Sequence, residues 1–308
     1  MDSLNKIFSQ ISTSNSIKSR KALNPISAKR IYFSGPYHRQ NWSLPDSIIY
    51  YITKNPSTAK LFQKLVQMCK YFFIKNPIII IKQFYNREKR ELQAILEKIE
   101  KRIILSNISY KFWVTAGEIE PTSKIISSII PHLYKIDVKQ IRVCRQTFSF
   151  NDFVCFSKNV ENIDLNHIIL KKENVSNIPL EKLVEALPKL KNLSVNQHFD
   201  RYLITSETMK ELLKIKHFPQ IDVIRFDGLD DTFDIETFYD YMKKNKHTRF
   251  SFAFSFSYQL SDAYKNRLEE IIDEVIETQH HDYKVPLFTV PHSDIFKWFK
   301  MRELYYSE

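Results

Sequence analysis

The first clear hydrophobic pattern of the chain lies within residues 41–85. Leu44, Ile48 and Ile52 recur every four residues, a spacing that places them on one face of an α-helix. Pro45 fits the first turn of that helix, where its missing N–H would have no partner in any case. The pattern predicts a helix that begins near Pro45 and carries one apolar stripe.

A second helix is predicted after the polar break at residues 55–57. Its apolar stripe consists of Leu61, Leu65, Met68 and Phe72. Pro77 should end this helix before four consecutive isoleucines. The two helices would form a hairpin whose apolar stripe needs something to pack against. The stripe could close a small internal core or bind another polypeptide.

Residues 86–103 mix charged residues with apolar residues at helical spacing. Leu92, Ile95, Leu96 and Ile99 would share one face of a helix. The sequence therefore predicts an amphipathic helix that connects the hairpin to the rest of the chain.

From residue 104 to residue 308, short strand-like runs alternate with helix-like runs. Residues 187–196 and 218–227 share one pattern: apolar-Pro-x-apolar-x-x-apolar-x-apolar, followed by Asn or Asp. Residues 160–166 and 138–143 keep the strand part of this pattern. The equivalent apolar positions would be Ile141, Ile163, Leu193, Ile224 and Phe252. Their spacings of 22, 30, 31 and 28 residues are close to the roughly 20–29 residues of leucine-rich repeats.

Helical stretches separate these predicted strands. Their apolar positions are Ile178, Leu180, Leu183, Val184 and Leu187, then Met209, Leu212, Leu213 and Ile215, then Ile235, Phe238, Tyr239 and Met242. Each helix would cover one face of a parallel sheet, so that every repeat buries its apolar residues against its neighbours. The predicted fold class is α/β, with a helical hairpin followed by an open, curved solenoid similar to leucine-rich repeats. A doubly wound α/β domain is the competing fold, but it normally carries a glycine-rich loop at a strand end.

The module at residues 41–85 resembles an F-box. The resemblance rests on the Leu44-Pro45 start, on the apolar residues that follow, and on Met68-Cys69-Lys70-Tyr71-Phe72, which is similar to the late Val-Cys-Lys-x-Trp-like stretch of that family. The chain departs from the family pattern at Ser47, where Glu is frequent, and at Phe72, which replaces Trp. The matching positions are Leu44, Pro45, Ile48, Ile52, Leu65, Cys69 and Phe72.

This resemblance implies that the module binds a Skp-family adaptor and, through it, a cullin within a ubiquitin ligase. The repeats would then hold an unknown protein substrate, and the chain would need no catalytic site, cofactor or metal of its own. Target contacts are expected at outward-facing strand positions, because alternate residues of a strand face away from the core. These positions are Glu161, Asp164, Lys191, Ser194, Asp222 and Arg225.

The excess of basic over acidic residues comes wholly from the first third of the chain. The net charge is +11, and residues 1–102 hold 19 Lys and Arg against 6 Asp and Glu. Residues 1–40 combine these basic residues with many serines and little apolar periodicity, which predicts a disordered basic tail. The charge also defines the main alternative, a repeat scaffold or basic nucleic-acid-binding protein without a ligase partner.

Little in the composition favours catalysis. Only 3 glycines are present, which excludes glycine-rich phosphate loops and nucleotide chemistry of the familiar kinds. His280 and His281 are adjacent and have no second ligand pair at a recognisable spacing, which favours a solvated turn over a metal site.

The 3 cysteines lack Cys-x-x-Cys spacing and predict a reduced protein inside the cell, cytoplasmic and/or nuclear. The most apolar stretch, residues 71–81, is divided by Lys75-Asn76-Pro77 and is far shorter than a membrane span. We therefore expect no membrane contact.

Overall fold

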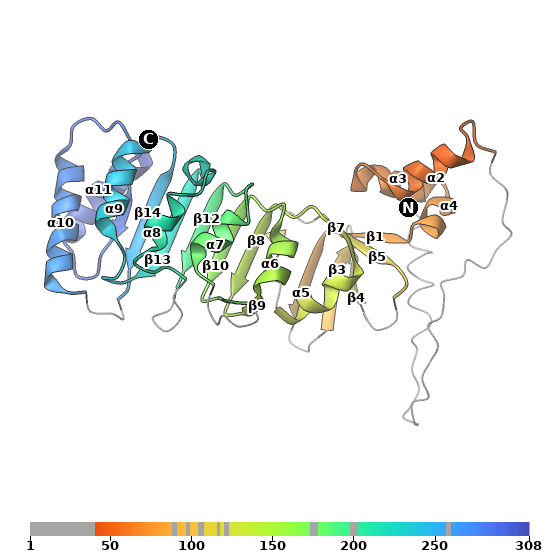
Figure 1. Cartoon of the computed structure of the whole chain (residues 1–308), viewed down its shortest axis with the longest axis horizontal. Coiled ribbons are helices and arrows are strands. Elements are labelled where there is room, and N and C mark those ends of the chain that lie inside the picture. Colours follow the sequence, from red (N-terminus) through yellow and green to blue (C-terminus); the bar gives the residue numbers. More distant parts are fainter. Residues whose placement is uncertain are drawn as a thin grey trace, which may run out of the picture. The chain divides into compact units, whose positions relative to one another are not determined.

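The computed structural model describes most of the chain beyond residue 40. The described residues are 41–87, 91–96, 99–103, 108–115, 118–119, 123–172, 178–197, 203–256 and 260–307. The predicted basic tail at residues 1–40 lies outside them. The described protein is an α/β protein with parallel sheets, as the sequence predicts (Figure 1).

The chain divides into two compact units. Among the described residues, the first unit contains those up to Thr115 together with Pro131–Ile136, and the second contains the remainder. The predicted boundary at residue 104 is therefore placed too early. Strand β5 (Lys111–Val114) and strand β7 (Leu133–Ile136) belong to the first unit because they extend a parallel sheet that starts with β1 (Ile78–Ile81).

The first unit begins with three helices: α2 (Asp46–Lys54), α3 (Ala59–Met68) and α4 (Lys70–Lys75). Pro45 immediately precedes α2, as predicted. The Thr58 hydroxyl accepts a hydrogen bond from the backbone N–H of Leu61 at 3.1 Å, which caps the start of α3. Helix α2 and helix α3 both contact α4.

The four isoleucines of β1 form a buried strand. β1 pairs with β5, and β5 pairs with β7, all in parallel. Phe112, Trp113 and Val114 of β5 are fully buried. Parallel strands that are covered on both faces are typically continuous apolar runs, which explains why this segment is so hydrophobic. No helix among the described residues is both long and apolar enough to cross a bilayer.

The connecting helix predicted at residues 86–103 is wrong. The described residues of this segment form an antiparallel sheet of β2 (Gln83–Arg87), β3 (Glu91–Leu96) and β4 (Ile99–Ile103). In its register, Leu92 is opposite Ile103 and Leu96 is opposite Ile99. Apolar residues at this spacing are compatible both with one face of a helix and with neighbouring strands, so the spacing alone did not distinguish the two.

The second unit is built on a seven-stranded sheet in which every neighbouring pair is parallel. Its strands, in spatial order, are β6 (Glu118–Ile119), β8 (Gln140–Cys144), β10 (Asn162–Asn166), β12 (Asn192–Asn196), β13 (Val223–Leu229), β14 (Arg249–Phe254) and β15 (Leu287–Thr289). Spatial order follows chain order throughout, which is the arrangement expected for a repeated strand–helix unit. Strands β9 (Thr147–Ser149) and β11 (Ile169–Lys171) form a separate parallel pair.

The strand register tests the predicted repeat positions directly. Ile163 lies beside Ile141 on one side and beside Leu193 on the other, and Leu193 lies beside Ile224. These three pairings confirm that the first four predicted positions are equivalent. The fifth position, Phe252, is wrong by two residues, since Ile224 lies beside Phe250 and Phe252 lies beside Phe226. A shift of two residues keeps the side chain on the same face of the sheet, so the pattern alone could not reveal it.

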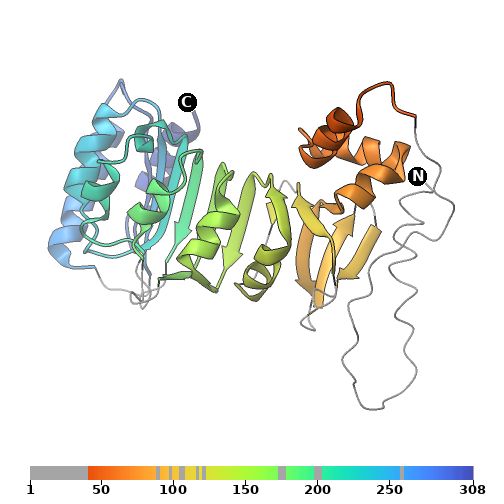
Figure 2. The ribbon, with the colours of Figure 1, turned by 45° about the vertical axis from the view of Figure 1, so that its right-hand side comes forward.

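Helices cover one face of this sheet, as Figures 1 and 2 show. They are α6 (Phe150–Ser157), α7 (Leu180–Glu185), α8 (Thr208–Leu212), α9 (Ile235–Lys244) and α10 (Asp262–Glu277). Helix α5 (Ser123–Ile129) contacts α6. The apolar positions predicted for α9, Ile235, Phe238, Tyr239 and Met242, are all buried. The helix-covered face of the sheet is therefore the core of the second unit.

Aromatic residues dominate the C-terminal part of this core. The ring of Phe252 stacks on Phe226 with centroids 5.2 Å apart and lies 4.3 Å from the ring of Phe238. Aromatic and small residues alternate at residues 250–258, a pattern that predicts a strand with one aromatic face. The structure confirms this for Phe250, Phe252 and Phe254, which are buried, whereas β14 ends at Phe254. The aromatic stripe is thus core over the length of β14.

Candidate functional site

Helix α2 turns an apolar stripe to solvent. Ile48 is 46% exposed, and Leu44 and Tyr51 on the same side are also exposed. Ile49, the next residue, points inward and is only 6% exposed. Ile52 is half-buried between the two sides. The predicted stripe of Leu44, Ile48 and Ile52 therefore exists and faces outward for most of its length.

Helix α3 repeats this arrangement. Phe62 and Val66 point inward and are buried, whereas Leu61 and Met68 are exposed, Met68 by 81%. Leu65 is half-buried, and the exposed Lys64 lies in the same stripe because it is three residues from Leu61. Each of the two helices thus has a buried apolar side and a separate exposed apolar side.

Polar contacts hold the inner sides of the helices in place. The Thr53 hydroxyl donates to the carbonyl of Ile49 at 2.6 Å, and the Asn76 side-chain amide donates to the carbonyl of Thr53 at 2.8 Å. The Tyr134 hydroxyl of β7 donates to the carbonyl of Lys54 at 3.3 Å. These bonds give hydrogen-bond partners to carbonyl groups at the C-terminal end of α2 and anchor the helix to its own unit. The outer apolar stripe of α2 takes no part in this anchoring.

Phe72 does not belong to the exposed stripe. The chain breaks the helix at Cys69, whose φ of −150° and ψ of 127° are extended, and α4 starts afresh at Lys70. The break changes the direction of the side chains that follow, so Phe72 is buried and packs edge-on against Trp42, with centroids 5.6 Å apart. The predicted adaptor contact at Phe72 is corrected to a core position.

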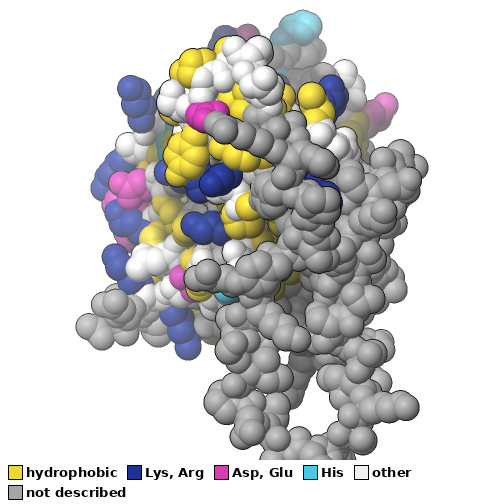
Figure 3. Space-filling model, turned by 90° about the vertical axis from the view of Figure 1, so that its right-hand side faces the viewer, with side chains coloured by type: hydrophobic (Ala, Val, Ile, Leu, Met, Phe, Trp, Pro, Cys, Tyr) yellow, Lys and Arg dark blue, Asp and Glu magenta, His cyan; other side chains and the backbone are white. Residues whose placement is uncertain are grey.

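The other predicted adaptor positions remain accessible to different degrees. Leu44, Pro45 and Ile48 are exposed, and Ile52, Leu65 and Cys69 are half-buried. We define the helical apolar face by its residues Leu44, Ile48, Tyr51, Leu61, Leu65 and Met68. Tyr51 was not among the predicted positions, although its spacing of seven residues from Leu44 was the signal that could have found it. In Figure 3, apolar and basic side chains lie next to one another on the visible described surface.

The second candidate surface is the face of the seven-stranded sheet opposite to its helices, here called the outward sheet face. Three of the six predicted target contacts lie on it in register, with Ser194 beside both Asp164 and Arg225. Asn162 and Asn192 are also paired there, and an amide hydrogen bond joins their side chains. Polar residues from separate strands are therefore assembled side by side on this face, and Asp164, Ser194 and Arg225 point outward as predicted.

The other three predicted target contacts are not strand positions. Each of them, Glu161, Lys191 and Asp222, directly precedes a strand. They therefore lie in a row at the N-terminal ends of the parallel strands, here called the N-terminal edge of the sheet. The Glu161 carboxylate forms ion pairs with Lys139 and with Lys191, the latter at 2.9 Å. The Asp222 carboxylate lies 2.8 Å from His247 Nε2. These residues form a row of alternating charge along the N-terminal edge, here called the charge ladder. From the alternation of the sequence, Glu161, Lys191 and Asp222 were expected on the outward face of the strands instead.

The ion pairs of the charge ladder shift the pKa values of Glu161 and Lys191. Hydrogen bonds from Lys139 and Lys191 lower the pKa of Glu161 to about 2, and the Glu161 carboxylate raises the pKa of Lys191. Both residues are thus held in their charged forms. The ion pairs are solvent-exposed, so their contribution to folding is small, but they fix the spacing of charges along one edge.

Two residues that border the outward sheet face were missed from the sequence. Arg249 of β14 lies beside Val223, next to the predicted Arg225 on the neighbouring strand. It could have been found by applying the repeat frame with Phe250, instead of Phe252, as the equivalent residue. Tyr305 comes from α11 (Ile295–Ser307), and nothing in the repeat pattern indicates where that helix packs.

No metal-ligating cluster of three or more His, Cys, Asp or Glu side chains occurs within the described residues. His281 follows α10, and its Nε2 is 2.9 Å from the carbonyl oxygen of Val275, so this imidazole contacts the backbone of the last turn of that helix. Cys69, Cys144 and Cys155 are free thiols.

Comparison with known proteins gives one short match. No protein-family model matches the chain, and no solved structure shows a significant match. The chain is 32% identical over 111 residues to a protein named Chaperone protein ClpB from Malacoplasma penetrans (strain HF-2). The match spans 36% of this chain and 15% of that chaperone. The chain thus covers only a small part of the length of this relative.

Proposed function

We propose that the chain is the substrate-recognition subunit of a cullin–RING ubiquitin ligase. The helical apolar face would bind a Skp-family adaptor, and through it a cullin, while the second unit, as a solenoid similar to leucine-rich repeats, would bind a target protein. Ubiquitin transfer would be accelerated by holding the target near the ligase, without a catalytic site, cofactor or metal in this chain. The site of action would be inside the cell.

The observation that carries this proposal is the exposure of the helical apolar face. Ile48, Tyr51 and Met68 remain accessible although the inner sides of α2 and α3 are already packed. Scattered apolar residues on a surface are ordinary, but a stripe repeated on two consecutive helices favours a protein partner. The stripe also coincides with the Leu-Pro start that resembles an F-box.

Co-purification with a Skp-family adaptor tests this half of the proposal. Replacing Leu44 and Ile48 by Asp puts two carboxylates in the proposed contact, and we expect adaptor recovery to fall by at least about tenfold. The matched control is Ala263→Asp with Asn266→Asp, which adds two carboxylates at exposed positions of α10. Undiminished recovery of the adaptor by the first variant would remove the proposed docking face.

A second candidate function, nucleic-acid binding without a ligase partner, is favoured by the lysines of the helical module. Lys60, Lys64, Lys70 and Lys75 are all exposed, and Asp46 is the one acidic residue in α2 to α4. This function requires binding of RNA or DNA that weakens steeply as salt is raised. Unchanged electrophoretic mobility of nucleic acid at low salt would eliminate it.

A further inference from the structure

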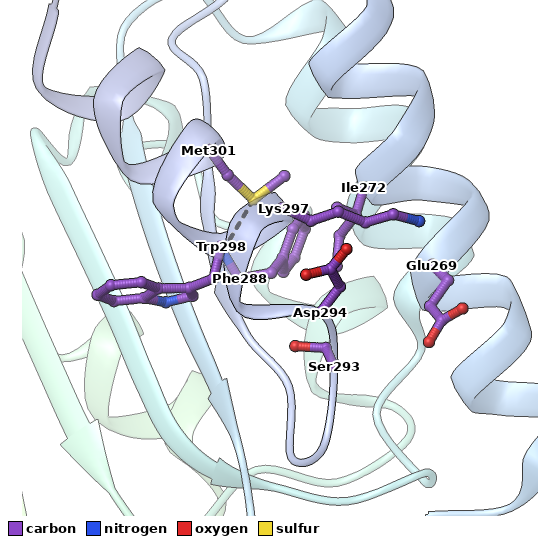
Figure 4. A pocket seen from close by; sticks show the side chains of 8 residues that line it. All are labelled: Glu269, Ile272, Phe288, Ser293, Asp294, Lys297, Trp298 and Met301. Carbon is purple, nitrogen blue, oxygen red and sulfur yellow. Dashed lines mark hydrogen bonds between the residues drawn. The ribbon is translucent and has the colours of Figure 1, made fainter.

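Helix α11 packs against β15, the last strand of the seven-stranded sheet. The Met301 sulfur accepts a hydrogen bond from the backbone N–H of Phe288 at 3.4 Å, and Tyr305 is buried on the same side of the helix. In Figure 4, the Lys297 side chain extends toward α10, where its ammonium lies 2.6 Å from the Asp273 carboxylate. The inner side of α11 is therefore fixed to β15 and to α10.

The opposite side of α11 is apolar as well. Phe296 is 79% exposed and Phe299 is 52% exposed, and Ile295 and Tyr306 are also exposed. Phe299 lies three residues after Phe296 and seven before Tyr306, so the three rings share one side of the helix. We call these four residues the α11 apolar face. A surface helix normally turns polar residues to solvent on the side away from its core, and α11 does not.

Exposed large apolar residues gather in only two places within the described residues. One is the segment 44–68, which contains the helical apolar face, and the other is the α11 apolar face; Phe256 alone lies elsewhere. A single exposed apolar side chain is ordinary, whereas a group on one side of a helix indicates contact with another molecule. The second group therefore needs a partner of its own.

The charges around the two apolar faces differ. Helices α2 to α4 carry exposed lysines and one acidic residue, Asp46, so that face would repel a second copy of itself. On α11, the exposed Arg302 and Glu303 each lie three or four residues from both Phe299 and Tyr306. Neither forms an ion pair with another described residue. A face that carries both charges beside its apolar residues can be complementary to itself, as a two-fold interface requires.

A lipid surface fits the α11 apolar face less well. The neighbouring α10 carries more acidic than basic residues, and its Glu269, Glu270 and Glu277 are exposed. Anionic lipid headgroups would be repelled by these carboxylates. A second copy of the chain brings its own arginine and lysine side chains to the same region, so the acidic residues do not oppose it.

We propose that two copies of this chain associate through their α11 apolar faces, with the two helices antiparallel around a two-fold axis. An axis that passes midway between Arg302 and Glu303 places Arg302 of one copy opposite Glu303 of the other. The same axis places Phe299 opposite Tyr306, because both pairs have the same midpoint along the helix. The contact then joins aromatic rings at its centre to two ion pairs. This inference does not depend on the proposed function.

Sedimentation velocity of the full chain over a range of concentrations tests the interface. Replacing Phe299 and Tyr306 by Asp should raise the dissociation constant of the dimer by at least about tenfold, because the aromatic contact is replaced by buried carboxylates. Both positions are exposed, so circular dichroism should show an unchanged fold. The matched control, Leu44→Asp with Ile48→Asp, places the same charge on the helical apolar face and should change the dissociation constant by less than about twofold.

Exchanging the two charges sharpens the test. Arg302→Glu alone and Glu303→Arg alone should each weaken the dimer by about threefold or more, since like charges then meet across the axis. A mixture of the two variants should associate about as strongly as the wild type, because both contacts of the mixed pair join opposite charges. Loss of folding in either variant could not be rescued by mixing.

Four results would overturn the interface. They are a chain that stays monomeric up to about 100 μM, a dimer that the Phe299 and Tyr306 variant leaves unchanged, a mixture no stronger than the single variants, and a monomer that binds phosphatidylserine vesicles through α11. The α11 variants should keep the adaptor and the Leu44 and Ile48 variant should keep the dimer. Failure of this interface and failure of the proposed function therefore give different results.

Discussion

The helical apolar face and the outward sheet face expose opposite chemistry. The first consists of apolar side chains such as Ile48 and Met68 on two helices, with Lys64 among them. The second consists of amides, hydroxyls and charges that come from different strands and already partly bind one another, as in the ion pair Arg142–Asp164. Burial of the first would give affinity, whereas the second can select a partner by its pattern of charge.

The two faces also differ in the hydrophobic core that lies beneath each of them. Behind the outward sheet face lies the aromatic core of the second unit, where Phe252 contacts rings from two other strands and from α9. Behind the helical apolar face lies a smaller core around Phe62 and Phe72. Stability and binding should therefore separate cleanly when neighbouring residues that point to opposite sides are compared.

The largest effect is expected in β14. Phe252→Ala should lower the free energy of unfolding by about 3–5 kcal/mol, because it leaves a cavity among stacked rings. Ser251→Ala, one residue earlier on the outward sheet face, should change the free energy by less than about 0.5 kcal/mol. Urea unfolding of both variants measures the contrast. Similar losses at the two positions would show that the outward face is not independent of the core.

The same comparison on α2 should give a smaller difference. Ile49→Ala is expected to cost about 2–4 kcal/mol, since Ile49 is buried, and Ile48→Ala less than about 1 kcal/mol. Adaptor recovery should show the reverse order among the folded variants. Thermal unfolding gives the first quantity and co-purification the second. If Ile48→Ala destabilised as strongly as Ile49→Ala, the outer stripe would be structural.

Gly228 tests how the outward sheet face is shaped. The register of β13 shifts between Asp227 and Leu229, and Gly228 has a φ of +80° there. A Cβ at this position would lie 2.3 Å from the carbonyl oxygen of Gln197, so Gly228→Ala must move backbone. We expect a loss of about 2 kcal/mol in the free energy of unfolding. A stability equal to that of the wild type would show that β12 and β13 can adjust freely.

The smallest effect concerns pH. The pKa of Glu161 falls from an ordinary value of 4.5 to about 2 on folding, so its ion pairs stabilise the folded state above about pH 4.5. This stabilisation should disappear as pH falls from 4.5 toward 2, where the carboxylate takes up a proton. Unfolding of the wild type and of Glu161→Gln should therefore converge in acid and differ near neutrality. A difference that stayed constant through this range would contradict the ladder.

Much of the second unit could be read from the sequence. The alternation at Leu193-Ser194-Val195 and Ile224-Arg225-Phe226 specified strands with one buried side, and the helix-covered residues between them carried a clear apolar period. The predicted contacts at Asp164, Ser194 and Arg225 consequently fell on the correct face. The other three contacts, predicted at Glu161, Lys191 and Asp222, did not fall on that face. Each of these residues lies one position before its strand begins, at the N-terminal edge of the sheet.

In the second unit, the sequence by itself determined most of the strands and helices and the side of each that is apolar, because these depend on local period and on residue type. Only the tertiary structure decided that residues 83–103 pair as strands, that Phe72 is buried beyond the break at Cys69, and that Tyr305 meets Arg249. Those outcomes depend on contacts between residues far apart or on a local change of direction, and their free energies do not appear in any single stretch of sequence.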